Sequence, residues 1–157
     1  MNLFHSSRIC FFTLRSISTM SETPHYTGAL LSKINSVGEF HDVFLIGNRH
    51  APTAFIPEAE AMLRYNLLKE ENDEYLEACK SGDVVEIADA LGDLLYITFG
   101  TILRHGLQHK IEEVFDEIHR SNMSKLDKEG KPIFREDGKV MKSELYFRPN
   151  IKAVLEK

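Results

Sequence analysis

Apolar residues recur at steps of three and four along most of the chain after residue 28, which is the spacing of amphipathic helices. Gly38 is a weak point that could divide the first stretch. Pro57 is well placed to begin the second helix, and Gly82 is well placed to end it. Asp83 can cap the third helix, which ends at Gly106. We expect helical segments over 29–46, 57–80, 84–105, 109–119 and 149–154.

The stretch 121–150 has no helical period and is rich in Lys, Gly and Pro. Gly130 and Asp137-Gly138 mark turns, so residues 133–135 and 139–141 could pair as a small hairpin. The pattern therefore predicts an all-α protein, a four- to five-helix bundle followed by an irregular, basic C-terminal segment.

Carboxylates interrupt the apolar stripe of the second helix. At about 100° per residue, with Leu67 as the reference, Glu71 and Glu74 lie in the middle of the stripe and Glu70 lies at its edge. Acid-rich helices are common, and these three residues could also be ordinary solvated acids.

The third helix strengthens the case for a site. It is apolar on nearly every side, so we expect it to be buried on most sides. Its acids Glu86, Asp89 and Asp93 are spaced by three and four and form one strip, which Tyr96 and Gly100 continue.

Carboxylates that converge between two helices predict a metal site. A buried ionised carboxylate costs several kcal/mol unless it is paired or holds a metal, and few cations lie nearby in the sequence. Oxygen ligands of this kind favour hard divalent cations, Mg²⁺ or Mn²⁺.

Mg²⁺ usually also binds substrate phosphates, and the segment after the fourth helix supplies candidate phosphate-binding residues: Arg120, Asn122, Lys125, Lys131, Arg135, Lys139 and Lys142. A basic segment can equally be solvated surface.

Composition narrows the class of protein. The 157 residues suffice for one domain, and the formal net charge of −5 argues against a dedicated nucleic-acid binder. Cys10 and Cys79 have no metal-ligand spacing and form no disulfide framework. No apolar run approaches the roughly 20 residues that span a bilayer.

Residues 1–28 differ from the domain expected over 29–157. They contain Arg8 and Arg15, serines and aromatic residues, and the first acid is Glu22. This composition suits a mitochondrial transit peptide. It equally suits a disordered tail, or a start at Met20 that would leave a cytosolic protein.

The acid motif resembles that of a known superfamily. Glu70-Glu71-x-x-Glu74 followed by Glu86-x-x-Asp89 resembles the signature of the all-α nucleoside triphosphate pyrophosphohydrolases, which include MazG, the phosphoribosyl-ATP pyrophosphohydrolases and the dimeric dUTPases. The stretch 89–96 is similar to the second metal helix of the phosphoribosyl-ATP branch. The stretch 120–139 looks like the tail of such proteins. The resemblance covers residues 37–151.

The resemblance implies hydrolysis between the α- and β-phosphates, which yields a nucleoside monophosphate and pyrophosphate. It implies Glu71, Glu74, Glu86 and Asp89 as metal ligands. Glu70 would bind metal or activate the water, and Asp93 would orient a ligand or hold a further metal. Asn122, Lys125, Arg135 and Lys139 would contact the phosphates or the base. Phe40, Phe44 and Tyr96 would line an apolar base pocket.

The expected substrate is a deoxynucleoside or non-standard nucleoside triphosphate, cleared as unwanted. Phosphoribosyl-ATP is the alternative substrate, and a non-catalytic helical nucleotide-binding module is an alternative to an enzyme. A carboxylate-bridged redox bundle is disfavoured because none of the predicted helices carries a Glu-x-x-His pair. We expect a homo-oligomer with the site near a subunit interface, since the apolar third helix is hard to bury in so small a bundle.

Overall fold

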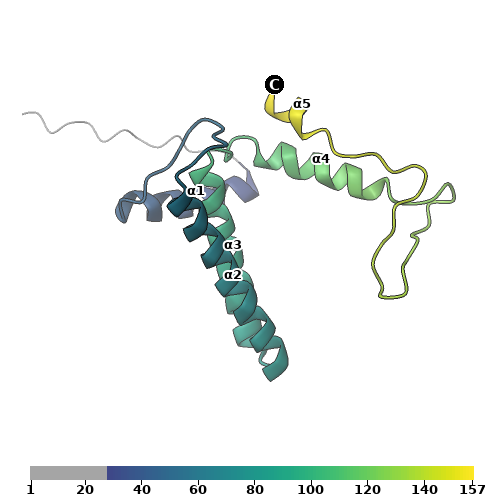
Figure 1. Ribbon diagram of the computed structural model, residues 1–157, viewed down its shortest axis with the longest axis horizontal. Coiled ribbons are helices and arrows are strands. Elements are labelled where there is room, and N and C mark those ends of the chain that lie inside the picture. Colours follow the sequence, from purple (N-terminus) through teal and green to yellow (C-terminus); the bar gives the residue numbers. More distant parts are fainter. Residues whose placement is uncertain (1–27) are drawn as a thin grey trace, which may run out of the picture.

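The computed structural model describes residues 28–157 and folds them into five α-helices (Figure 1). They are α1 (Ala29–Val43), α2 (Glu58–Ser81), α3 (Val84–Arg104), α4 (Ile111–Met123) and α5 (Ile151–Leu155). The predicted all-α class is confirmed. The predictions made for residues 1–28 concern a segment that, apart from Gly28, lies outside the described residues.

The helix ends follow the local signals in the sequence. Helix α2 starts directly after Pro57 and ends at Gly82, whose φ of 73° is left-handed. Asp83 caps α3, because its Oδ1 accepts a hydrogen bond from the backbone N–H of Val85 at 2.9 Å. Helix α1 passes through Gly38 without a break, so the possible division of the first helix is wrong.

Helices α2 and α3 form an antiparallel hairpin, and α1 packs against the α3 side of it (Figure 1). A small core of Leu31, Ile34 and Val37 from α1 and Leu103 from α3 joins these elements. Helix α4 reaches this core through Ile111 in its first turn and then runs away from the hairpin. The single chain is therefore an open arrangement in which the hairpin projects from one end.

An ion-pair network fixes the loop between α1 and α2. Glu60 accepts hydrogen bonds from Arg49 at 2.8 Å and from Arg104 Nε and Nη2 at 2.7 Å each. These bonds lower the pKa of Glu60 to about 2. Arg104 also donates to the carbonyls of Ile46 and Gly47 at 2.7 and 2.8 Å. The network ties the loop to both helices of the hairpin.

The C-terminal arm, residues 124–150, is irregular as expected. It returns along α4, where Ser121 Oγ donates to the Phe147 carbonyl at 2.8 Å. The predicted hairpin is present in minimal form, as one antiparallel bridge between Phe134 and Val140. Two flanking backbone bonds, Arg135 N–H to Lys139 O and Met141 N–H to Ile133 O, complete it.

Helix α3 is not buried on most sides in the single chain, which corrects the prediction. Val84, Val85, Leu91 and Leu95 are exposed on it, and Phe115 of α4 is 64% exposed. The reason is that α4 leaves the hairpin uncovered instead of packing along it. No helix of the described residues is both long and apolar enough to cross a bilayer.

Candidate active site

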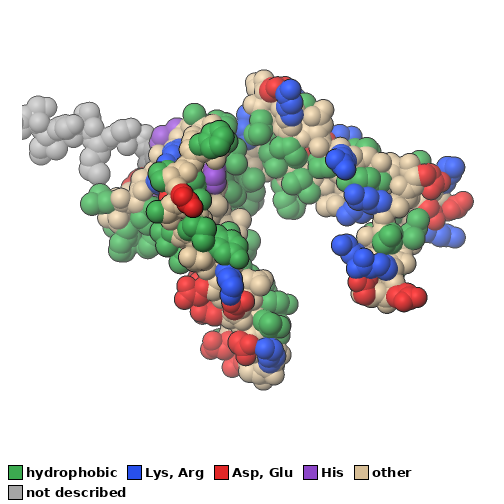
Figure 2. Space-filling model, in the orientation of Figure 1, with side chains coloured by type: hydrophobic (Ala, Val, Ile, Leu, Met, Phe, Trp, Pro, Cys, Tyr) green, Lys and Arg blue, Asp and Glu red, His purple; other side chains and the backbone are tan. Residues whose placement is uncertain are grey.

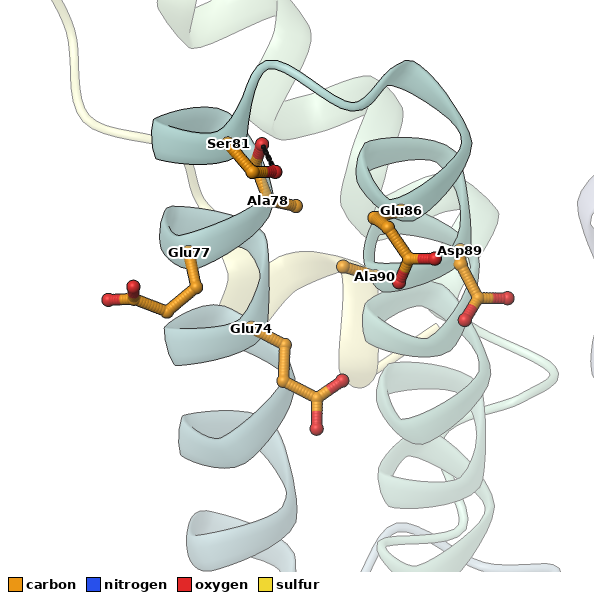
Figure 3. A pocket seen from close by; sticks show the side chains of 7 residues that line it. All are labelled: Glu74, Glu77, Ala78, Ser81, Glu86, Asp89 and Ala90. Atoms are coloured by element: carbon orange, nitrogen blue, oxygen red, sulfur yellow. Dashed lines mark hydrogen bonds between the residues drawn. The ribbon is translucent and has the colours of Figure 1, made fainter.

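The predicted acids face one another across the α2–α3 hairpin. An open hollow of about 480 Å³ lies near its free end (Figure 3). Glu74 reaches from α2 toward α3, whereas Glu77 points away and pairs with Lys80 at 2.6 Å. The small residues Ala78 and Ala90 are buried between the helices. The residues lining the hollow are Glu74, Glu77, Ala78, Ser81, Glu86, Asp89 and Ala90.

Glu71 is the electrostatic centre of the site. Its Oε2 is fully buried and has no hydrogen-bond partner among the described residues. Burial raises the pKa of Glu71, and the negative charges of other acids raise it further. Those acids come from both helices: Glu74, Asp93, Glu70 and Asp89. The structure thus brings the two predicted acidic strips together around Glu71.

The other acids are more accessible than the sequence suggested. Glu70, Glu74, Glu86, Asp89 and Asp93 are exposed in the single chain, and Glu71 is half-buried, so the predicted burial of the acids holds only in part and only for Glu71. None of the six acids forms an ion pair with a residue of the described part. Within residues 28–157, no three His, Cys, Asp or Glu side chains already converge on one point as a metal cage.

The chemistry of the donors fits a hard divalent cation. Oxygen donors from two facing helices are the ligands that Mg²⁺ and Mn²⁺ prefer. A buried carboxylate oxygen without a partner, beside four further carboxylates, is a position where a cation relieves both burial and repulsion. The residues suited to hold it are Glu71, Glu74, Glu86, Asp89 and Asp93.

The expected phosphate-binding residues lie elsewhere in the chain. Asn122 is near the end of α4, and Lys125, Arg135 and Lys139 are on the C-terminal arm, away from the hairpin (Figure 1). Arg135 is paired with Asp137. In Figure 2, acidic side chains gather toward the free end of the hairpin, while Lys and Arg side chains are spread over α4 and the arm across an open gap. Within one chain the two groups are not brought together.

The expected aromatic residues do cluster. The Phe40 ring meets Phe44 at a centroid distance of 4.3 Å and Tyr96, edge-on, at 5.6 Å. Phe40 and Tyr96 remain 38% and 37% exposed. Tyr96 continues the acidic strip of α3 by one turn beyond Asp93, so the aromatic surface borders the site.

Two buried residues next to this surface were missed in the sequence. Arg64 of α2 is 8% exposed and His41 of α1 is 2% exposed. One signal was available for Arg64: it precedes Glu71 by seven residues, two helical turns, and so lies on the same side of α2. Nothing in the sequence marked His41, because its burial depends on the packing of α1 against the hairpin.

The fold and the acids define a class. Two antiparallel helices that carry Glu-Glu-x-x-Glu and Glu-x-x-Asp across a common groove place the protein among the all-α nucleoside triphosphate pyrophosphohydrolases. Residues 37–122, more than half of the chain, match the phosphoribosyl-ATP pyrophosphohydrolase family, and the chain belongs to this family. No curated protein matches it.

Proposed function

We propose that this protein is a Mg²⁺-dependent pyrophosphohydrolase that cleaves a deoxynucleoside or non-standard nucleoside triphosphate between its α- and β-phosphates. The observation that carries the proposal is Glu71, whose Oε2 is buried without a hydrogen-bond partner and whose carboxylate has four acids of α2 and α3 around it. Phosphoribosyl-ATP is the second candidate substrate, and the family match favours it about equally. Both substrates are cleaved at the same kind of bond.

Each part of the site has a distinct task. When bound, Mg²⁺ or Mn²⁺ would neutralise phosphate charge and acidify a water. Glu71, Glu74, Glu86, Asp89 and Asp93 would hold the cation. Glu70 borders this set from the exposed edge of α2, where it can take the proton of the attacking water.

The basic residues would enter from a second copy of the chain. The six site acids of the hairpin form no ion pair within the described chain, and Lys125 and Lys139 belong to the distant arm. The exposed apolar surfaces of α3 and α4 supply an area that association would bury. In a homo-oligomer, Asn122, Lys125, Arg135 and Lys139 of one subunit would bind the phosphates held by the acids of another. They would stabilise the departing pyrophosphate.

The first experiment measures pyrophosphate release by the purified protein with Mg²⁺ or Mn²⁺. Its panel contains ribo- and deoxynucleoside triphosphates, non-standard triphosphates and phosphoribosyl-ATP. Glu71→Gln should abolish turnover. Glu77→Gln, a change of the same kind on a side chain that points away, should leave it near wild type. Orthophosphate as the product would refute the bond assignment. Nucleotide binding without any turnover would favour the non-catalytic module.

A mixing experiment tests the shared site. Glu71→Gln and the double variant Lys125→Ala/Lys139→Ala should each be inactive alone. When they are unfolded together and refolded, hybrid dimers carry one intact site, and about a quarter of the wild-type activity should return. Absence of recovery despite hybrids seen by native mass spectrometry would place the arm and the acids in the same subunit.

A further inference from the structure

Arg64 is a buried cation without a hydrogen-bond partner in the described chain. It is 8% exposed, its Nε is fully buried, and no hydrogen bond joins its side chain to another described residue. Burial lowers the pKa of Arg64, with a further lowering from the charge of Arg104. A guanidinium in such a position loses its hydration and gains no acceptor in return, which is unfavourable. An acceptor from outside the described chain would satisfy it.

The acid next to Arg64 is already engaged, and His41 forms no hydrogen bond with the guanidinium. Glu60, the nearby acid, already receives hydrogen bonds from Arg49 and Arg104. His41 Nδ1 donates to Asn48 Oδ1 at 2.9 Å, because the Asn48 amide nitrogen is itself the donor to Asp42. Burial and the Arg64 charge lower the pKa of His41 and favour its neutral form.

Gly100 opens the space in which these side chains meet. A Cβ at residue 100 would lie 3.0 Å from His41 Nε2 and 3.2 Å from Arg64 Nη1. The glycine therefore admits the guanidinium to the α1–α3 junction, beside the surface of Phe40 and Tyr96. The half-exposed rings of Phe40 and Tyr96 and the buried guanidinium of Arg64 are adjacent parts of one surface.

The register along the hairpin relates this surface to the acids. Arg64 precedes Glu71 by seven residues, and Gly100 follows Asp93 by seven residues, each about 10 Å along its helix. Tyr96 lies between Gly100 and Asp93. The order along the hairpin is therefore guanidinium, aromatic surface and carboxylates, which matches the order base edge, base face and phosphates in a nucleotide.

We propose that Arg64 is a specificity-determining residue that donates two hydrogen bonds to a 6-oxopurine base, through its O6 and N7 acceptors, while Phe40 and Tyr96 pack against the base. Arginine offers donors only, and its bidentate pairing with O6 and N7 is the geometry that guanine and hypoxanthine present. Adenine presents an amino group at the same position, which cannot accept. This inference rests on the proposed function, because it assumes that the substrate is a nucleotide held by the carboxylates.

The test compares dGTP, dITP, dATP and 7-deaza-dGTP, which lacks the N7 acceptor, in wild type and Arg64→Met. Wild type should prefer dGTP and dITP over dATP in kcat/KM, and the variant should lose about 10- to 100-fold of that preference. Arg64→Lys should keep part of the preference through one bond. Lys69→Met, an exposed change on the same helix, should keep all of it.

Binding measurements separate this inference from the proposed function. Calorimetry with non-hydrolysable α,β-methylene analogues and Mg²⁺ reports base preference without turnover. A 6-oxopurine preference that Arg64→Met removes supports the inference even if no nucleotide is hydrolysed. Equal weakening of all four bases, or an equal loss of binding to pyrophosphate alone, overturns it in favour of a structural or phosphate-binding role. Wild-type turnover with no preference among the bases overturns it as well.

Discussion

Replacing Glu71 by glutamine should stabilise the metal-free protein although it abolishes activity. The wild-type carboxylate has a buried oxygen without a hydrogen-bond partner, and four acids repel it. An unsatisfied buried polar group costs about 1–3 kcal/mol. The amide introduced by Glu71→Gln stays unsatisfied but carries no charge, so about 1 kcal/mol should be recovered. That gain corresponds to a rise of about 2–4 °C in Tm for a domain of this size.

Magnesium should reverse the order of the two proteins. A ligand at 100 times its Kd stabilises the folded state by about 2.7 kcal/mol, and this gain requires the Glu71 carboxylate. Wild type should therefore become the more stable protein at saturating Mg²⁺, whereas Glu71→Gln should respond weakly. Glu77→Gln is the matched control. Its side chain is exposed and paired with Lys80, so it should show neither the gain without metal nor the reversal.

The pH dependence of stability tests the unfavourable charge of Glu71 independently of the metal. The pKa of Glu71 is raised in the folded state, so the folded protein holds this proton at a pH where the unfolded chain has released it. The free energy of unfolding of the metal-free wild type should therefore fall as the pH rises through the folded-state pKa. Below 4.5, the ordinary pKa of a glutamate, wild type and Glu71→Gln should be equally stable.

Thermal and urea denaturation with and without Mg²⁺ measure these differences directly. The reasoning fails if Glu71→Gln is less stable than wild type without metal at neutral pH. It also fails if Mg²⁺ raises the Tm of wild type and variant equally, because the cation would then be bound without Glu71.

Three further predictions concern the scaffold. Glu60→Gln should destabilise the fold by up to about 3 kcal/mol at neutral pH. The pKa of Glu60 in the folded state is lowered to about 2, so the stability advantage of wild type should disappear as the pH falls from 4.5 toward 2. Urea titrations at several pH values measure this loss. Gly106→Ala should cost at least about 2 kcal/mol, since φ is 66° and the new Cβ would lie 2.1 Å from the Ala51 carbonyl oxygen. Gly82→Ala, with φ 73° and open space around it, should cost only about 1 kcal/mol. Equal losses of stability in Gly106→Ala and Gly82→Ala would contradict the predicted steric clash at Gly106. Asp83→Ala should lower stability by about 1 kcal/mol through loss of the α3 cap, while Asp83→Asn should not.

The sequence by itself determined the helices and the acidic strips. Caps and breakers such as Asp83 and Gly82 act locally, and the 3.6-residue period places Glu71 and Glu74 on one side of α2 wherever that helix packs. The strip of Glu86, Asp89 and Asp93 follows from the same geometry. These features depend on contacts within a few residues of the chain, so the order of the amino acids is enough to predict them.

Only the tertiary structure decided which residues are packed around the two acidic strips and how deeply they are buried. Packing of α1 against the hairpin buries His41 and Arg64 together over Gly100, and no period in the sequence marks a contact between three helices. The departure of α4 from the hairpin leaves α3 exposed and holds the C-terminal arm, which carries Lys139, away from the hairpin. Burial and long-range charge depend on residues far apart in the sequence. For this reason the sequence indicated the two acidic strips but overestimated the burial of their carboxylates, and it gave no sign that Arg64, two turns before Glu71, is buried.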